Sequence, residues 1–434
     1  MARLAARVVF VSAVLWARAG RAADPLPASD PAAPVAEQRA ADEGDFVTRR
    51  YEPAVLPIIG GNSDIGLQLG VAATLSRFAD GIVPYAWNMD LVVSLSFKGT
   101  PTGTELAQQS YVWDIDVPGL AGGRLRLNPF AEFRRTVNQG YFGLGDASNG
   151  VRPPGSDSRY FQYQHVEGNA RLIARYELEG PLYLLSSTIG RYVNPSAYPG
   201  SKLAADESAV AGNGSRLLYG IEPLAIASEG AGIVYDSRDS EIFPREGWFD
   251  QLGARYSQGF PLHADVQYGE TEATIARYTR LPGPFVLATQ LAADLKFGHV
   301  PFFELFTGGV FLPDYMIGGS ASIRGVPFGR YLGEIKAVGN IELRALLIRT
   351  HLFGQTFQFG NDVFADAGRV WNDYSFRSPL DGRGSGIKWG VGVGEYFLWG
   401  QAAMFRLELA YSPDAESENP GFPFGIYISD GVSF

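Results

Sequence analysis

The sequence predicts an all-β protein, a transmembrane antiparallel β-barrel of 16 strands. Three observations carry this prediction. Apolar and polar residues alternate with a period of two along most of the chain. Many of the alternating segments reach the length of about 9–11 residues that a tilted strand needs to cross a membrane. The N-terminus is typical of an exported protein.

The composition excludes several other classes of protein. The chain contains no run of 18 uninterrupted apolar residues, which excludes an ordinary helical membrane protein. Charged residues make up 19% of the sequence, below the roughly 25% of soluble domains. The net charge of -10 argues against a nucleic-acid partner. Because the chain has no cysteine, no disulfide can hold an exported fold together.

The N-terminal residues predict export. Two arginines precede an apolar run from Val8 to Trp16, and small residues follow. We predict a signal peptide at residues 1–22, because the run is too short for a membrane-spanning helix. An N-terminal amphipathic helix is the alternative. Residues 23–53 are rich in Ala, Pro, Asp and Glu and lack large apolar side chains, which predicts a disordered periplasmic linker.

The alternation is clearest in the segment from Tyr85 to Lys98. One face is aromatic or aliphatic throughout, and the other carries Asn, Asp, Ser and Lys. A soluble β-sandwich with its apolar face inward is the alternative. Charges on the polar face and aromatic residues near the segment ends instead favour a membrane barrel at residues 54–434, with a wet lumen and an interface girdle. The last residue, Phe434, is the C-terminal strand signal expected of bacterial outer-membrane barrels.

Fifteen alternating segments can be recognised. An even number of strands is the rule for single-chain bacterial barrels, so one less regular segment counts as two strands. The regular segments lie near 64–78, 85–98, 106–117, 122–136, 181–193, 247–258, 285–298, 335–348, 357–367, 388–397, 402–411 and 424–434. The less regular ones lie near 160–177, 217–236 and 266–281.

Three local motifs stand out within this pattern: a charged turn between strands, an arginine in the apolar, glycine-rich stretch SASIRGVPFG, and a strand with the spacing Phe-x-Asp-x-Gly. Each is weak alone, because Asp, Pro and Gly are ordinary turn residues. The motif residues are Tyr235, Asp236, Arg238, Asp239, Pro244 and Gly247 in the turn; Ile323, Arg324 and Gly325 in the arginine stretch; and Phe364, Asp366 and Gly368 in the strand.

In this combination and order, the motifs resemble those of the BamA/TamA family, the bacterial surface antigen barrels of the outer-membrane insertase superfamily. The resemblance covers about residues 54–434 and places five strands after the arginine, as in the family's 16-stranded barrels. It implies that a long extracellular loop, between His299 and Glu334, folds into the lumen. The aromatic that follows Arg-Gly in the family is displaced here to Phe328, and Asp430 stands where the family usually has an apolar residue.

The alternation independently supplies partners for the arginine. Glu342 shares the polar face of its strand with Asn340 and Arg344, and Asp366 likewise lies on a polar face. Both carboxylates therefore face the lumen that the loop would enter. We predict a loop latch in which Arg324 forks onto Asp366 with Glu342 nearby, and Gly325 completes the motif. An ordinary exposed loop arginine is the alternative.

The resemblance implies a function without chemical catalysis, namely assisting insertion or translocation of polypeptides at the bacterial cell outer membrane. It further implies a weak seam between the first and last strands, here carrying Gly66 and Gly70 and then Gly425 and Gly431. The repeated periplasmic receptor domains of the family are absent, so the chain resembles its barrel-only branch. A passive pore or a structural outer-membrane protein is the alternative function.

The remaining expectations concern ligands and partners. The four histidines have no metal-ligand spacing, and the sequence has neither a Gly-x-Ser-x-Gly elbow nor a phosphate-binding loop. We therefore expect no enzyme activity, no catalytic residues, no cofactor and no metal. The expected partners are outer-membrane lipids, client outer-membrane or secreted polypeptides, and the barrel assembly machinery that inserts the chain itself.

Overall fold

The computed structural model describes residues 49–62, 66–82, 85–100, 103–210, 214–260, 265–352, 355–399, 403–417 and 421–430. The predicted signal peptide, most of the predicted linker, Gly431 and Phe434 lie outside these residues. No helix in the described ranges is long and apolar enough to span a membrane.

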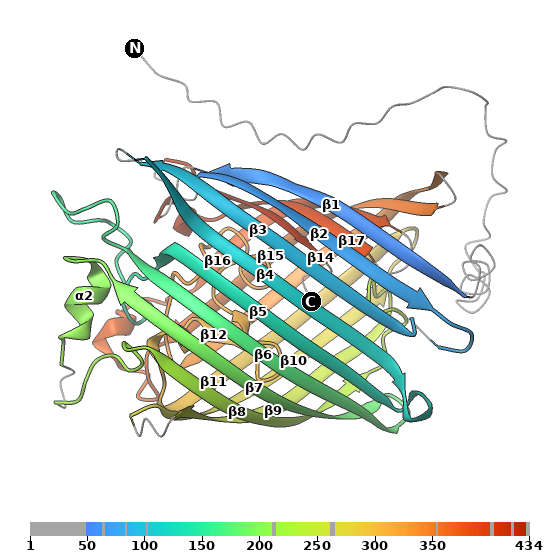
Figure 1. Cartoon of the computed structure of the whole chain (residues 1–434), viewed down its shortest axis with the longest axis horizontal. Coiled ribbons are helices and arrows are strands. Elements are labelled where there is room, and N and C mark those ends of the chain that lie inside the picture. The colour runs from blue at the N-terminus through green and yellow to red at the C-terminus, as the bar shows by residue number, and fades with distance from the viewer. Residues whose placement is uncertain are drawn as a thin grey trace, which may run out of the picture.

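Sixteen antiparallel strands form one sheet in simple sequential order, which confirms the predicted barrel and its strand number. Figure 1 shows these long strands strongly tilted. They are β1 (Arg50–Asn62), β2 (Gly66–Phe78), β3 (Trp87–Thr100), β4 (Gly103–Leu120), β5 (Leu125–Gly140), β6 (Gln162–Glu179), β7 (Leu182–Ala197), β8 (Leu224–Asp236), β9 (Gly247–Phe260), β10 (Gln267–Arg280), β11 (Phe285–His299), β14 (Ile335–Leu352), β15 (Gln355–Trp371), β16 (Lys388–Trp399), β17 (Ala403–Tyr411) and β18 (Phe424–Asp430).

The sheet has two edges in the described residues. Its order begins with β1 and ends with β18, and no ladder joins the described parts of these two strands. Their other sides are paired, β1 with β2 over 13 residues and β18 with β17 over only seven. The chain therefore brings its first and last strands to the open side of the sheet.

The first strand corrects the sequence prediction. β1 begins at Arg50, so the predicted boundary at residue 54 falls inside it, and Gly66 and Gly70 lie in β2 instead of the first strand. β1 escaped prediction because Pro53 and Pro57 resemble linker residues. Proline is tolerated in an edge strand, where its missing N–H faces away from the paired neighbour.

The two faces of the sheet follow the predicted alternation. Along β14, the side chains of Asn340, Glu342 and Arg344 are buried on the lumen side, whereas Ile341 and Leu343 are exposed on the outer face. The same distribution recurs around the barrel: large apolar residues are exposed on the outer face, and many charged residues are buried on the lumen side. This is the pattern of a barrel whose outer face meets lipid.

Connection length distinguishes the two ends of the barrel. At one end the turns after β4, β6, β10 and β14 are short. The other end holds the long connections after β5, β7, β11 and β15, together with the short ones after β1 and β3. The longer loops of such barrels are extracellular. The loop after β7 contains the short helix α2 (Lys202–Glu207), visible at one end of the barrel in Figure 1.

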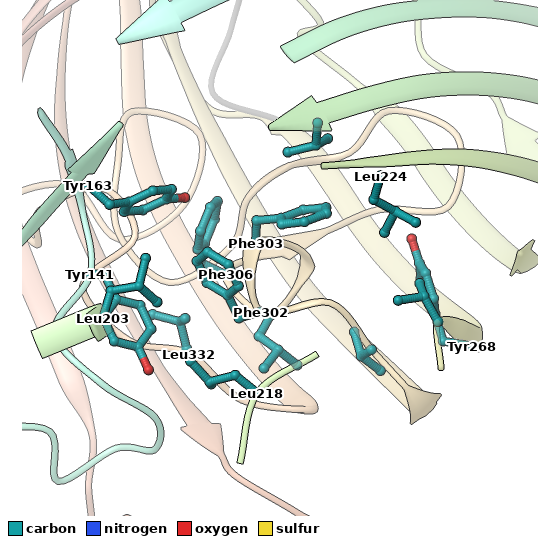
Figure 2. Close-up of a cluster of buried hydrophobic side chains, with 14 of the residues drawn as sticks. Tyr141, Tyr163, Leu203, Leu218, Leu224, Tyr268, Phe302, Phe303, Phe306 and Leu332 are labelled. Atoms are coloured by element: carbon teal, nitrogen blue, oxygen red, sulfur yellow. The ribbon is translucent and has the colours of Figure 1, made fainter. Parts of the chain in front are cut away.

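The loop between β11 and β14, here called the plug segment (residues 300–334), fills the lumen. It contains a 3₁₀ turn at Phe302–Glu304 and the two-residue strands β12 (Thr307–Gly308) and β13 (Asp314–Tyr315). Figure 2 shows Phe302, Phe303 and Phe306 packed among Tyr141, Tyr163, Leu203, Leu224 and Tyr268. Val310 and Phe311 pack on β6, β7 and β8, and Ile317, Ile323 and Val326 pack on β14 and β15. This confirms the predicted loop inside the barrel.

Candidate functional site

Arg324 lies at the inner end of the plug segment and is completely buried. Its Nε donates to Asp366 Oδ2 at 2.7 Å and its Nη2 to Asp366 Oδ1 at 2.8 Å, a two-point fork. Its Nη1 lies 2.5 Å from Glu342 and donates to Glu408 at 2.7 Å. The structure thus brings Arg324, Asp366 and Glu342 together in the arrangement that the sequence predicts.

The strand motif forms a cradle for this arginine. The ring of Phe364 lies under the guanidinium, with Cζ 3.5 Å from the ring centroid. Asp366, two residues on, faces the same way and also accepts from the backbone N–H of Arg324 at 3.0 Å. At Gly368, a Cβ would come within 2.8 Å of the Ile323 side chain. Along this strand, Phe364 therefore stacks on the Arg324 guanidinium, Asp366 binds it, and Gly368 leaves room for Ile323.

Neighbouring arginines complete the charge balance. Arg344 donates to Glu342 at 2.5 Å, and Arg406 lies 3.1 Å from Glu408. Glu342, Glu408 and Asp362 bring their oxygens within 4.8 Å of one another, a spacing that could hold a cation. Because guanidinium groups already contact the two glutamates, the cluster fits an ion-pair network better than a metal site.

The pKa of Arg324 reflects the same balance. Burial alone would lower it, but the nearby Glu342 and Asp366 carboxylates outweigh burial and hold the pKa well above its usual value. The guanidinium is therefore charged at every physiological pH. Its removal would leave the facing carboxylates buried without their main counter-charge.

Two glycines let the loop tip touch the wall. Gly325 has a φ of 94°, a left-handed conformation that other residues rarely adopt. On β16, a Cβ at Gly390 would lie 1.8 Å from the carbonyl oxygen of Arg324. Gly390 thus permits close approach of the loop to the wall.

The loop tip is also tied to the last strand. The backbone N–H of Gly325 donates to the hydroxyl of Tyr427 in β18 at 2.8 Å. Phe328, the displaced aromatic of the motif, packs edge-on against the Tyr427 ring with centroids 6.0 Å apart. One tyrosine therefore connects the plug segment to the edge strand of the sheet.

A second anchor of opposite polarity holds the plug segment near its start. Glu304 is fully buried and forms ion pairs with Arg191 of β7 and Arg255 of β9. Arg255 also contacts Glu270, which lies 2.5 Å from Lys296. The plug segment is thus held by an anionic anchor at one end and by the cationic Arg324 at the other.

The turn motif lies at the opposite end of the barrel. Asp236 binds Arg238 at 2.9 and 3.0 Å, and Asp239 accepts the backbone N–H of Arg245 at 2.8 Å. Pro244 is buried and Gly247 has a φ of 112°, while Tyr235 is exposed on the outer face. The motif therefore shapes the turn itself, far along the strands from Arg324.

This turn also folds toward the lumen. Phe243 packs against Tyr396, Leu398 and Met404, with the Phe243 and Tyr396 rings 5.7 Å apart. The Tyr396 hydroxyl donates to Asp362 at 2.8 Å, within the Arg324 network. The turn is thus linked to the carboxylates around Arg324 indirectly, through Tyr396.

Sequence reasoning missed several of these residues. Glu408 shares a polar strand face with Arg406, so the sequence places it in the lumen. Nothing in the sequence assigns it to Arg324. Glu304 stands alone in the apolar stretch VPFFELF, so its buried partners could have been suspected. Tyr427 gave no signal, because tyrosine is ordinary in a membrane strand.

Comparison with known proteins places this architecture. Residues 224–429 match the Omp85 superfamily domain. The fold is similar to BamA from Haemophilus ducreyi lacking POTRA domains 1-3, with a TM-score of 0.50 and 14% identity, covering 88% of this chain and 70% of that chain. It is also similar to CdiB from Escherichia coli, with a TM-score of 0.51 and 13% identity, covering 88% of this chain and 62% of that chain. None of the curated proteins matches.

These findings agree with the motifs, the strand order and the lumen-filling loop. The domain match begins at β8 and ends in β18, so it includes the turn motif, the plug segment and the strand motif. The structural likeness extends the same architecture over most of the chain. Residues 224–429 therefore carry an Omp85 superfamily domain, and the chain is a bacterial outer-membrane β-barrel.

Proposed function

We propose that this barrel assists insertion or translocation of polypeptides at the outer membrane, with the gap between β1 and β18 as its working site. The observation that carries the proposal is the open sheet, whose two edge strands lack a common ladder in the described residues. An edge strand exposes unpaired N–H and C=O groups, which cannot stay unsatisfied in hydrocarbon. Such an edge can pair with an incoming strand.

Both edge strands have features that weaken backbone pairing between them. Pro53 and Pro57 remove two donors from β1, and proline in an edge strand hinders lasting pairing. The described part of β18 pairs with β17 over seven residues, and Gly425 contributes no side-chain packing there. These features support a seam that opens at low cost. The likeness to BamA and CdiB barrels supports the same general role.

A passive pore is the competing function, and the plug segment argues against an open one. Its buried aromatic residues pack across the lumen, and its two anchors hold it against several strands. A water-filled channel would need this segment to move. A structural outer-membrane role would need neither an open seam nor a movable loop.

Closing the seam covalently tests the proposal. The chain has no cysteine, so pairs of cysteines placed on β1 and β18 would form disulfides without competing thiols. We expect purified protein in liposomes to accelerate insertion of an unfolded test barrel protein when the cysteines are reduced, and to lose this effect when they are oxidised. A single-cysteine variant on β1 is the control.

Two results would reject the proposal. The reduced protein could give no acceleration over empty liposomes, or the oxidised pair could act as fast as the reduced pair. Steady ion conductance together with no acceleration would favour the passive pore.

A further inference from the structure

An apolar groove crosses the outer face of the barrel, well away from the open edges. It has a volume of about 640 Å³ and lies over β10, β11, β14, β15 and β16. Strand register explains its shape. One row across four neighbouring strands reads Leu291, Gly339, Ala367 and Trp389, so two small residues lie between two large ones. The large residues form walls, and the small residues form a floor.

The floor is the outer side of the wall that holds the arginine latch. Gly339 and Ala367 face outward, while their chain neighbours Asn340 and Asp366 face the lumen. Asn340 donates to Asp366 at 2.8 Å and to the Ser322 carbonyl at 2.7 Å. The groove and the latch are therefore back to back across a single layer of sheet.

A cation lies at one end of this groove. Arg277 of β10 is exposed on the outer face and lines the groove, and its Cζ lies 4.8 Å from the centroid of the Trp248 ring. Both residues lie near the ends of their strands on the side of the short turns, which is the periplasmic side. An exposed arginine next to a tryptophan at this level reaches the lipid headgroups.

We infer that this groove is a binding site for one glycerophospholipid of the periplasmic leaflet, with an acyl chain along the Gly339–Ala367 floor and the phosphate at Arg277. The outer face of the barrel meets lipid, so an apolar groove there is filled by hydrocarbon. The guanidinium matches the charge and the geometry of a phosphate. The inference rests on the outer-membrane barrel and is independent of the proposed insertion activity.

Two lipids and three variants of the full chain test this site. Native mass spectrometry of the protein in non-ionic detergent would measure binding of dioleoyl-phosphatidylglycerol and of dioleoylglycerol, which lacks the phosphate. Gly339→Phe fills the groove. A Cβ at Gly339 comes close only to the flexible end of Leu291, at 3.2 Å, and lies at an ordinary 3.8 Å from the Gln290 carbonyl oxygen, so the variant should fold. Gly190→Phe is the matched control, because Gly190 faces outward on β7 with open space around it.

We expect Gly339→Phe to weaken binding of both lipids by about tenfold or more, through loss of acyl-chain burial. Gly190→Phe should bind like the unaltered protein. Arg277→Gln should weaken phosphatidylglycerol binding about tenfold and leave dioleoylglycerol unchanged, since only one charge-assisted contact is lost.

Equal binding by the Gly339→Phe and Gly190→Phe variants would overturn the site, because it would mean that lipid binds the outer face without preference for the groove. An Arg277→Gln variant that binds both lipids normally would overturn the phosphate position. If Gly339→Phe fails to show a heat-sensitive folded band in SDS, Ala367→Leu replaces it with the same expected loss.

Discussion

Arg324 contacts three carboxylates, and each of these contacts is buried. Replacing it with alanine would leave Asp366, Glu342 and Glu408 facing one another without the central cation. Breaking a buried pair in this way costs about 3–5 kcal/mol. We expect Arg324→Ala to lower markedly the temperature at which the folded band in SDS converts to the unfolded one.

Two further variants calibrate that shift. Arg324→Lys keeps the charge but loses the fork and the stacking on Phe364, so an intermediate shift is expected. Arg216→Ala breaks an exposed pair with Asp265 at 3.6 Å, which is worth at most about 1 kcal/mol. An Arg324→Ala band as heat-stable as that of Arg216→Ala would contradict the latch.

Glu304 offers a separate prediction for the opposite anchor. Glu304→Gln keeps the size of the side chain but removes the charge that Arg191 and Arg255 share. A charge-assisted hydrogen bond contributes about 1.5–3 kcal/mol, so a smaller loss than for Arg324→Ala is expected. Limited proteolysis should cut the plug segment sooner in this variant. Unchanged cleavage, with Glu241→Gln as a partly exposed control, would show that the anchor is unnecessary.

At the level of elements, most strands could be predicted from the sequence because alternation alone reports which face is wet. β1 could not, since two prolines break the strand pattern and only its position at the edge of the sheet makes them acceptable. Asp366 and Glu342 were predictable as inward carboxylates from the same alternation. Their meeting with Glu408 depends on the curvature of β14 to β17, which a linear pattern does not contain.

Tyr427 makes β18 responsive to the plug segment, and this connection can be tested by hydrogen exchange. Tyr427→Phe would leave the Gly325 N–H without its acceptor, at a cost of about 1–3 kcal/mol if it stays buried. We expect faster amide exchange in β17 and β18, because the ladder between them is short and loses its internal support. Strands on the far side, such as β7, should exchange as before.

Phe328→Ala provides the matched comparison. It removes the ring that packs on Tyr427 but leaves the hydrogen bond from Gly325 in place. A smaller increase in exchange, confined to β18, is therefore expected. Equal exchange in all three proteins would mean that the plug segment and the edge strand move independently.

At the scale of the whole molecule, the two anchors and the apolar packing act together to hold the plug segment inside the barrel. Glu304 binds the β7–β9 side, Arg324 binds the β14–β17 side, and the phenylalanines between them fill the space. Losing one anchor leaves the other to hold the plug segment. We therefore expect low conductance from the unaltered protein and from either single variant in planar bilayers.

The double variant Glu304→Gln/Arg324→Ala should behave differently. With both anchors gone, only apolar packing keeps the segment inside, and the ion-pair network at each anchor is left unbalanced. Because both anchors act on one segment, their effects should be non-additive, and conductance should rise by more than the sum of the two single variants. A purely additive rise would indicate two local defects in the wall. High conductance in the unaltered protein would show that the plug segment does not block ion flow.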